Sequence, residues 1–174
     1  MLDARPRFAV GQACGLPNPE CGTAQPCPTI WRVLTTIEFY RIDDDGHLYI
    51  SPAIREWSPL ADLGIDTVID LDAGLDECIP TTPEGCLYVY FPIYDEQLPN
   101  LARLDAVGTL GAELIRAGHR VLSHCGMGFN RSALIAGVIL NKLGVSGPQI
   151  VRQIRERRPG ALFNEVFAEY LAML

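Results

Sequence analysis

The sequence lacks the features of a membrane or secreted protein. No apolar run in its 174 residues is long enough to span a bilayer. The N-terminus has no charged segment followed by an apolar one, the pattern that is typical of a signal peptide. The longest apolar run, residues 133–140, fits a buried helix. We therefore expect a cytoplasmic protein with no membrane partner.

Metal ligands are also scarce. The chain has six cysteines and three histidines, and no pair has Cys-x-x-Cys spacing. Cys14, Cys21 and Cys27 are separated by six and five residues, which matches no common zinc pattern. We expect neither a metal nor a cofactor. Cys78 and Cys86 flank a short Pro/Thr loop, and a redox-sensitive disulfide between them is one hypothesis that their positions allow.

Basic charge is in deficit, with a net charge of −7, and this argues against a nucleic-acid partner. The charge is uneven: residues 1–99 carry 5 basic and 16 acidic side chains, whereas residues 100–174 carry 9 and 5. A run of arginines lies at positions 152, 155, 157 and 158. We interpret this run as a solvated helix end, the alternative being a role in orienting phosphorylated substrates.

The chain length and the hydrophobic pattern favour one α/β domain that follows a short N-terminal extension. The chain is 48% hydrophobic and has no internal repeat, which suits one compact core. Residues 1–30 are rich in proline and glycine and read as an irregular N-terminal extension, to which we assign no function. Apolar residues recur at helical spacing over 101–115, whereas 65–71 and 87–93 are β-rich. This alternation predicts a central, largely parallel sheet flanked by helices, with the functional site at the carboxyl ends of the strands.

The most informative segment lies between a short apolar run and a long helix-compatible one. It reads His124-Cys125-Gly126-Met127-Gly128-Phe129-Asn130-Arg131-Ser132. The order strand, tight loop, helix places free backbone N–H groups and the positive end of a helix dipole together. Gly126 and Gly128 are expected to let the backbone turn so that the N–H groups of residues 126–130 point inward as an anion-binding nest. A phosphate dianion fits such a nest.

The side chains of this loop have the residue types that phosphate chemistry needs. Five residues separate Cys125 from Arg131, so the cysteine can lie at the floor of the loop while the guanidinium grips two phosphate oxygens. The same N–H groups favour a thiolate, which makes Cys125 the candidate nucleophile. Ser132 can donate a hydrogen bond to the sulfur as it leaves phosphorus, and His124 is expected to support the loop from behind.

The motif His-Cys, two residues, Gly, two residues, Arg-Ser resembles the active-site signature of the cysteine-dependent protein tyrosine phosphatase superfamily. Segments from about residue 40 to 174 resemble its dual-specificity members in order, so we expect residues 31–174 to be a catalytic domain of that type. The resemblance implies metal-independent hydrolysis of phosphate monoesters through a phosphocysteine. It also implies a general acid, and Asp95 lies where the small dual-specificity phosphatases have theirs, with Glu96 as the fallback. Asp95 could instead be a solvated loop residue or a helix cap.

The resemblance also narrows the substrate. No segment resembles the aromatic loop that deepens the pocket of the strictly phosphotyrosine-specific members. This implies a shallow pocket open to phosphotyrosine, phosphoserine and phosphothreonine in proteins, or to small phosphorylated molecules. Residues 126–130 carry no lysine, unlike the loops that act on inositol lipids. Two alternatives remain. One is an RNA 5′-triphosphatase, because the segment Gly-Phe-Asn-Arg resembles the loop of those enzymes. The other is a non-catalytic phosphate-binding module.

Overall fold

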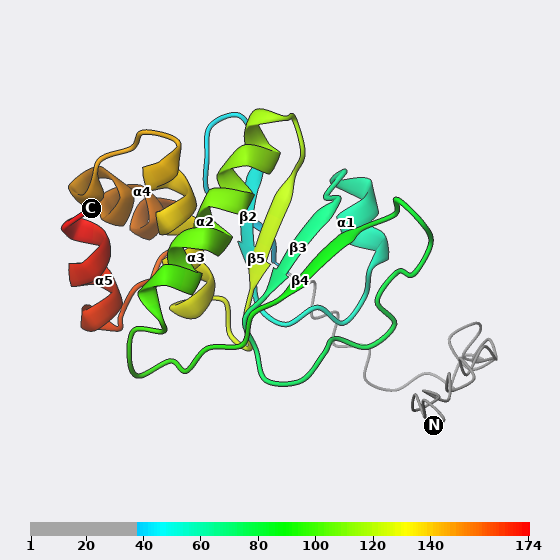
Figure 1. Cartoon of the computed structure of the whole chain (residues 1–174), viewed down its shortest axis with the longest axis horizontal. Coiled ribbons are helices and arrows are strands. Elements are labelled where there is room, and N and C mark those ends of the chain that lie inside the picture. Colours follow the sequence, from blue (N-terminus) through cyan, green and yellow to red (C-terminus); the bar gives the residue numbers. More distant parts are fainter. Residues whose placement is uncertain (1–37) are drawn as a thin grey trace, which may run out of the picture. The chain divides into compact units, whose positions relative to one another are not determined.

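The computed structural model describes residues 38–174, so the expected domain boundary after residue 30 lies outside the described residues and stays a prediction. Five strands form one sheet in the order β1-β2-β5-β3-β4 (Figure 1). They are β1 (Tyr40–Arg41), β2 (Leu48–Ser51), β3 (Thr67–Asp70), β4 (Leu87–Tyr90) and β5 (Val121–His124). The β1–β2 pair is antiparallel and the other pairs are parallel. The predicted α/β class with a largely parallel sheet is confirmed.

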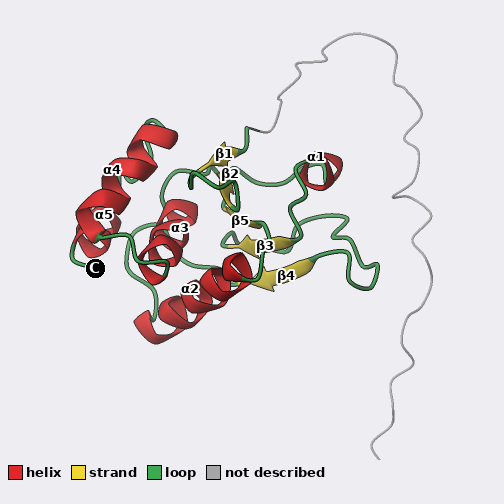
Figure 2. Cartoon of the chain, turned by 90° about the horizontal axis from the view of Figure 1, so that it is seen from above, coloured by secondary structure: helices red, strands yellow, loops and turns green. Residues whose placement is uncertain are grey.

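Five helices connect and cover these strands: α1 (Ser58–Asp62), α2 (Leu101–Arg116), α3 (Arg131–Lys142), α4 (Gly147–Arg157) and α5 (Glu165–Ala172). Figure 2 shows α1 on one side of the sheet and α2 to α5 on the other. The side chain of Asn100 begins α2 by accepting the backbone N–H of Arg103, and Asn164 does the same for the first turn of α5. None of the helices within residues 38–174 is long and apolar enough to cross a membrane.

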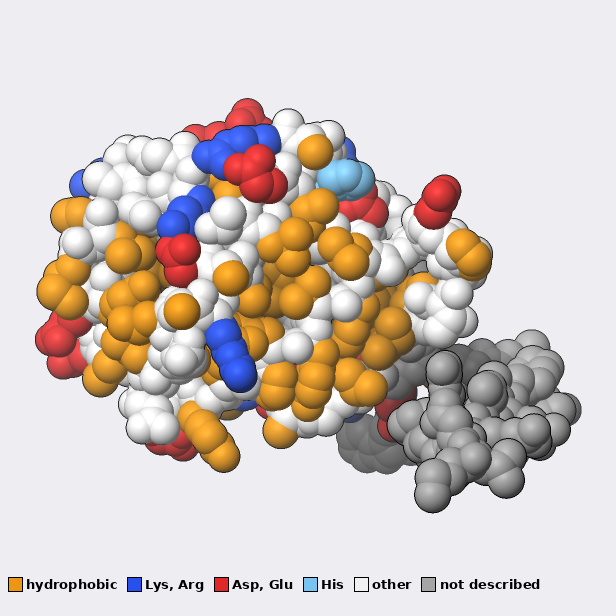
Figure 3. Space-filling view, viewed as in Figure 1, with side chains coloured by type: hydrophobic (Ala, Val, Ile, Leu, Met, Phe, Trp, Pro, Cys, Tyr) orange, Lys and Arg blue, Asp and Glu red, His pale blue; other side chains and the backbone are white. Residues whose placement is uncertain are grey.

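Alternating side chains in the strands build one apolar core on each side of the sheet. Ile69 and Val121 pack with the helices α2 to α5, whereas their neighbours Val68 and Leu122 pack with the residues around α1. The β-rich segment 87–93 forms a strand only to Tyr90, whose partner Asp70 is the last residue of β3. Beyond it, the N–H groups of Phe91 and Ile93 still donate to the carbonyl oxygens of Asp70 and Leu71. Strand β4 is an edge of the sheet, and Figure 3 shows apolar side chains on the face that it forms with α2.

Helix α3 runs through the centre of the larger core, with every residue from Ser132 to Leu140 buried. It therefore fixes the loop that precedes it relative to the ends of β5 and β2.

The hypothesis of a disulfide between Cys78 and Cys86 is wrong. Cys86 carries a free thiol, so the pair Cys78–Cys86 is not formed.

Candidate active site

The phosphate loop, residues 125–131, joins the end of β5 to the start of α3 at the carboxyl edge of the sheet. Gly128 has a φ of +71°, and a β carbon there would lie 2.6 Å from backbone atoms of Ser51 and Pro52. Gly128 thus turns the chain as expected. Gly126 has no positive φ, which corrects the expectation that both glycines turn the backbone. It is needed for space, because its β carbon would lie 2.9 Å from Oδ2 of Asp72.

The backbone of the loop has its carbonyl groups tied to the surrounding protein. The oxygen of Gly126 accepts the N–H of Ala53 at 3.4 Å, and that of Phe129 accepts the N–H of Leu162 at 3.0 Å. By contrast, the N–H groups of residues 126, 127, 129 and 130 donate to no acceptor among residues 38–174. The side chain of Asn130 does not cap α3. The loop therefore offers several free donors at a helix N-terminus, the arrangement that binds an anion.

Cys125 lies at the floor of this loop and is 2% exposed. Its Sγ accepts the backbone N–H of Gly128 at 3.3 Å and lies 3.6 Å from Oγ of Ser132. Both contacts place hydrogen-bond donors beside the sulfur, because the serine hydroxyl can turn its proton toward a thiolate. The predicted neighbours of the nucleophile are thus brought together, and their roles stay predictions.

Arg131 is held by one end of its guanidinium group. Its Nη1 donates to the carbonyl oxygen of Leu71 at 3.1 Å and to Oδ1 of Asp72 at 2.9 Å. Its Nε is buried and has no partner among the described residues. Burial alone would lower the pKa of Arg131, but the bond to Asp72 and nearby negative charges raise it, so the group stays charged. The edge formed by Nε and Nη2 is left to bind two oxygens of one phosphate.

Asp95 lies beside the phosphate loop, as predicted for the general acid. Its Oδ2 accepts a hydrogen bond from Nδ2 of Asn130 at 3.2 Å, and its backbone oxygen accepts one from Nδ2 of Asn164. Its Oδ1 is buried and has no partner among the described residues. Asp95, Glu96 and Arg131 line the same cleft of about 400 Å³. Glu96 is exposed and makes no hydrogen bond within residues 38–174, so Asp95 remains the better candidate.

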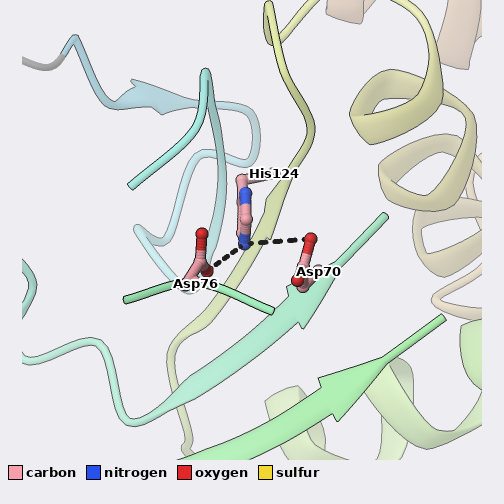
Figure 4. Close-up of side chains that lie close together, drawn as sticks. All are labelled: Asp70, Asp76 and His124. Atoms are coloured by element: carbon pink, nitrogen blue, oxygen red, sulfur yellow. Dashed lines mark ion pairs between the residues drawn. The ribbon is translucent and has the colours of Figure 1, made fainter. Parts of the chain in front are cut away.

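His124 lies behind the loop in a cluster of buried charges. Its Nε2 lies 2.9 Å from Oδ2 of Asp76 and 3.6 Å from Oδ1 of Asp70, and the side chains of His124 and Asp70 are fully buried (Figure 4). The Tyr88 hydroxyl donates to Oδ2 of Asp70 at 2.5 Å. Burial raises the pKa of Asp70, although its hydrogen bonds and His124 act against this. His124 thus lies beside these two acids, and its role in supporting the loop stays a prediction.

The same cluster has the donor types of a cation site. One ligand atom each from Asp70, Asp76 and His124 lies within 4.8 Å of the others. Both carboxylates already lie within hydrogen-bonding distance of the Tyr88 hydroxyl, and Nε2 of His124 faces them. The contacts are therefore explained by a charge network without a cation. The expected absence of a metal stays a prediction.

One arginine of the basic run at the end of α4 is not solvated, whereas Arg152, Arg155 and Arg157 are exposed as expected. The guanidinium carbon of Arg158 lies 4.0 Å from the ring centroids of both Tyr40 and Phe129, and the side chain is 14% exposed. Its Nε donates to the carbonyl oxygen of Gly128 at 3.5 Å. Burial lowers the pKa of Arg158. The solvated interpretation is therefore wrong for this residue, which braces the phosphate loop from outside.

Sequence reasoning missed the acids after β3 and the asparagine before α5. Asp70 is the last residue of β3, and Asp72 and Asp76 follow this strand, which is the direct neighbour of β5 in the sheet. Because the carboxyl ends of adjacent parallel strands meet at one edge, three acids at and just after the end of a β-rich run were a usable signal. Asn164 carried no such signal, because an asparagine before a helix is most simply read as a cap.

Comparison with known proteins finds similar structures but no match to a family model or to a curated sequence. Among solved structures, Tk-PTP in its active form is 28% identical and matches with a TM-score of 0.62, over 76% of this chain and 92% of its own. Human DUSP28 is 20% identical, with a TM-score of 0.65 over 76% of this chain and 94% of its own.

A mouse putative dual specificity phosphatase, solved in complex with zinc tungstate, is 22% identical, with a TM-score of 0.64 over 86% of this chain and 89% of its own. These structures have the sheet and helix arrangement found here, and they are the kind of protein that the sequence motif resembles. The chain therefore has the dual-specificity phosphatase fold of the cysteine-dependent protein tyrosine phosphatase superfamily.

Proposed function

We propose that this protein hydrolyses phosphate monoesters through a phosphocysteine formed on Cys125. The observation that carries the proposal is the phosphate loop itself. Free N–H groups at the start of α3, the open edge of Arg131 and the sulfur of Cys125 all belong to this one loop, residues 125–131. This combination supplies an anion site, a bidentate clamp and a nucleophile at the same place.

In the first step, the thiolate of Cys125 attacks phosphorus opposite the ester oxygen. A sulfur–phosphorus bond forms while the bond from phosphorus to the ester oxygen breaks, and Asp95 gives its proton to the departing oxygen. Oδ1 of Asp95 suits this role because it has no partner among the described residues, whereas Oδ2 is held by Asn130. The loop N–H groups and Arg131 stabilise the charge on the other phosphate oxygens.

In the second step, water replaces the sulfur. The carboxylate of Asp95 takes a proton from the attacking water, a phosphorus–oxygen bond forms, and the sulfur–phosphorus bond breaks to release phosphate and the thiolate. Ser132 donates a hydrogen bond from its hydroxyl group to the sulfur as negative charge develops there, a role that the 3.6 Å separation of Oγ from Sγ allows. No metal takes part in either step of this scheme.

The proposed substrates are proteins phosphorylated on tyrosine, serine or threonine, or small phosphorylated molecules. The mouse putative dual specificity phosphatase was solved in complex with zinc tungstate, and tungstate is a tetrahedral oxyanion like phosphate, which agrees with the proposal of a phosphate ligand. The contact between Asn130 and Asp95 favours a monoesterase over the triphosphatase alternative. Cleaving a phosphoanhydride releases a stabilised leaving group and gains less from a positioned acid.

The test is hydrolysis of p-nitrophenyl phosphate by reduced protein in the presence of a chelator, with Cys125→Ser as the control. We expect turnover by the wild type and only the background rate from the variant. Isothermal titration with inorganic phosphate then shows whether Cys125→Ser still binds the anion. If the folded wild-type protein binds phosphate without hydrolysing any ester tested, the non-catalytic binding module is the better explanation. Release of γ-phosphate from 5′-triphosphorylated RNA would favour the triphosphatase.

A further inference from the structure

Asp72 is an acid in direct contact with the residue proposed to grip the phosphate. Its Oδ1 lies 2.9 Å from Nη1 of Arg131 and also accepts the backbone N–H of Ala73 at 2.9 Å. Its own backbone N–H donates to Oδ1 of the buried Asp70 at 2.9 Å. A β carbon on Gly126 would lie 2.9 Å from its Oδ2. The carboxylate is thus fixed between Arg131 and the first turn of the phosphate loop.

The charge at this site is consequently low for a phosphate-binding cleft. Arg131 is the one cationic side chain among the residues that line the cleft, whereas Asp95 and Glu96, which also line it, are acids. Asp72 neutralises part of the charge of Arg131 through their ion pair. The side chain of Asp72 is 34% exposed. A dianionic phosphate still has the loop N–H groups as donors. A second phosphate group would lie outside the loop, where the described residues offer acids instead of cations.

The same cleft offers apolar contact to a leaving group. Ala73, Pro92, Ile93 and Tyr94 line it, and the Tyr94 side chain is 75% exposed. Aromatic rings gain from stacking on such a surface, whereas a further phosphate would lose hydration there without gaining a partner. The wall therefore suits the uncharged ring of a phenol ester better than the phosphate of a polyphosphate.

We propose that Asp72 is a specificity-determining residue, whose charge makes the cleft reject polyanions in favour of single phosphate esters. The inference rests on the proposed function, because it concerns the same phosphate loop. It separates two roles that Asp72 can have. Its hydrogen bonds orient Arg131, and an amide at position 72 can keep them. Its charge repels further phosphate groups, and an amide cannot.

The test compares anion binding by four proteins that cannot turn over: Cys125→Ser alone and Cys125→Ser combined with Asp72→Asn, Glu96→Gln or Asp62→Asn. Isothermal titration at low ionic strength, with chelator present, gives the dissociation constants of inorganic phosphate and tripolyphosphate. Removing one unit charge within ~10 Å of the extra phosphates, at an effective dielectric constant of about 20, predicts that Asp72→Asn tightens tripolyphosphate relative to phosphate about tenfold. We expect Glu96→Gln to shift the ratio in the same direction.

Asp62→Asn is the matched control, because it makes the same change of net charge at an exposed position on α1, across the sheet from α2 to α5. The inference is overturned if Asp72→Asn leaves the ratio unchanged, or shifts it no more than Asp62→Asn does. Because the readout is binding, the result does not depend on turnover. Failure of the wild type to hydrolyse p-nitrophenyl phosphate would reject the proposed function and leave the charge selectivity to be judged by its own ratio.

Discussion

Asn130 of the phosphate loop donates a hydrogen bond from Nδ2 to Oδ2 of Asp95 at 3.2 Å. Its Oδ1 accepts the backbone N–H of Asn164 at 3.1 Å, and the side chain of Asn164 donates to the backbone oxygen of Asp95. One buried amide therefore links the phosphate loop, the segment that carries the proposed acid and the turn before α5. The acid is held in place by residues that lie 35 and 69 positions away in the sequence.

Replacing Asn130 with alanine should slow the step that needs the acid. Without its hydrogen bond, Asp95 is free to turn away from the leaving oxygen, so we expect kcat to fall and KM to change little. The loss should stay below the roughly 10²–10⁴-fold that a general acid contributes. Steady-state kinetics on a series of aryl phosphates measures it, and esters with poor leaving groups should lose most.

A double-mutant cycle decides whether Asn130 acts through Asp95. In protein that already carries Asp95→Ala, the change Asn130→Ala should cost little further activity, because the residue that it positions is gone. Additive losses would show that Asn130 supports the phosphate loop for another reason. Circular dichroism and the urea midpoint of each variant exclude loss of folding as the cause.

The architecture was predictable because it follows from patterns that are local in the chain. The helix over 101–115 appears as Leu101–Arg116, and the two β-rich segments contain β3 and β4. The phosphate loop was predictable for the same reason: strand, glycines, cysteine, arginine and helix follow one another within a few residues. Asp95 needed the resemblance, since a loop aspartate alone does not indicate an acid.

What the sequence could not show are contacts between distant segments. Arg158 looked like one of four arginines at an exposed helix end, and nothing in that run indicates that Tyr40 and Phe129 enclose it. The ion pair of Asp72 is likewise made with Arg131, which lies 59 positions later in the sequence. Gly126 looked like a turn residue, whereas the structure uses its small size beside Asp72. In each case the decisive contact is with a residue that is distant in the sequence and becomes a neighbour only when the chain folds.

Ser132→Ala should separate the two chemical steps. The hydroxyl lies 3.6 Å from the sulfur of Cys125 and is proposed to stabilise the thiolate as it leaves phosphorus. Hydrogen bonds to charged groups contribute about 1.5–3 kcal/mol, so kcat should fall by roughly tenfold to a hundredfold. Because formation of the phosphocysteine does not need this donor, rapid mixing with p-nitrophenyl phosphate should show a burst of p-nitrophenol. A slow first step with no burst would contradict the assignment.

The ion pair between Asp72 and Arg131 should make stability depend on pH. Burial acts to raise the pKa of Asp72, but its bonds to Arg131 and to the Ala73 N–H outweigh burial and lower the pKa below its ordinary value of 3.8. Its contribution is therefore complete above pH 3.8 and is lost as the pH falls through the lowered value. The unfolding free energy of wild type minus that of Asp72→Asn should be flat from pH 7 to about pH 5 and shrink under acid.

Urea unfolding at a series of pH values measures this difference. Asp70 has a raised pKa, which acts in the opposite direction, but it is present in both proteins and cancels to a first approximation. Asp62→Asn serves again as the control, because Asp62 has no ion pair among the described residues. A difference for Asp72→Asn that does not change under acid, or that matches the control, would show that the ion pair adds no stability.

Gly108→Ala should destabilise the fold although alanine favours helices. Gly108 lies in the middle of α2 where α2 crosses α3, and a β carbon there would lie 2.4 Å from Cγ1 of Val138. A valine in a helix has one strongly preferred rotamer and cannot move that methyl aside, so the helices must separate. Overpacking costs typically about 1–3 kcal/mol, which exceeds the gain of at most ~1 kcal/mol from helix propensity.

Two further variants make this expectation specific to the contact. Gly111→Ala would meet Cδ1 of Ile139 at 2.6 Å, the far end of a more flexible side chain, so it should cost less than Gly108→Ala. Adding Val138→Ala to Gly108→Ala removes the obstructing methyl groups and should recover part of the lost stability, although Val138→Ala alone is destabilising. The exposed Thr109→Ala tests helix propensity without the contact. Purely additive effects of the pair would mean that α2 and α3 relax without strain, and that the glycine serves α2 rather than its contact with α3.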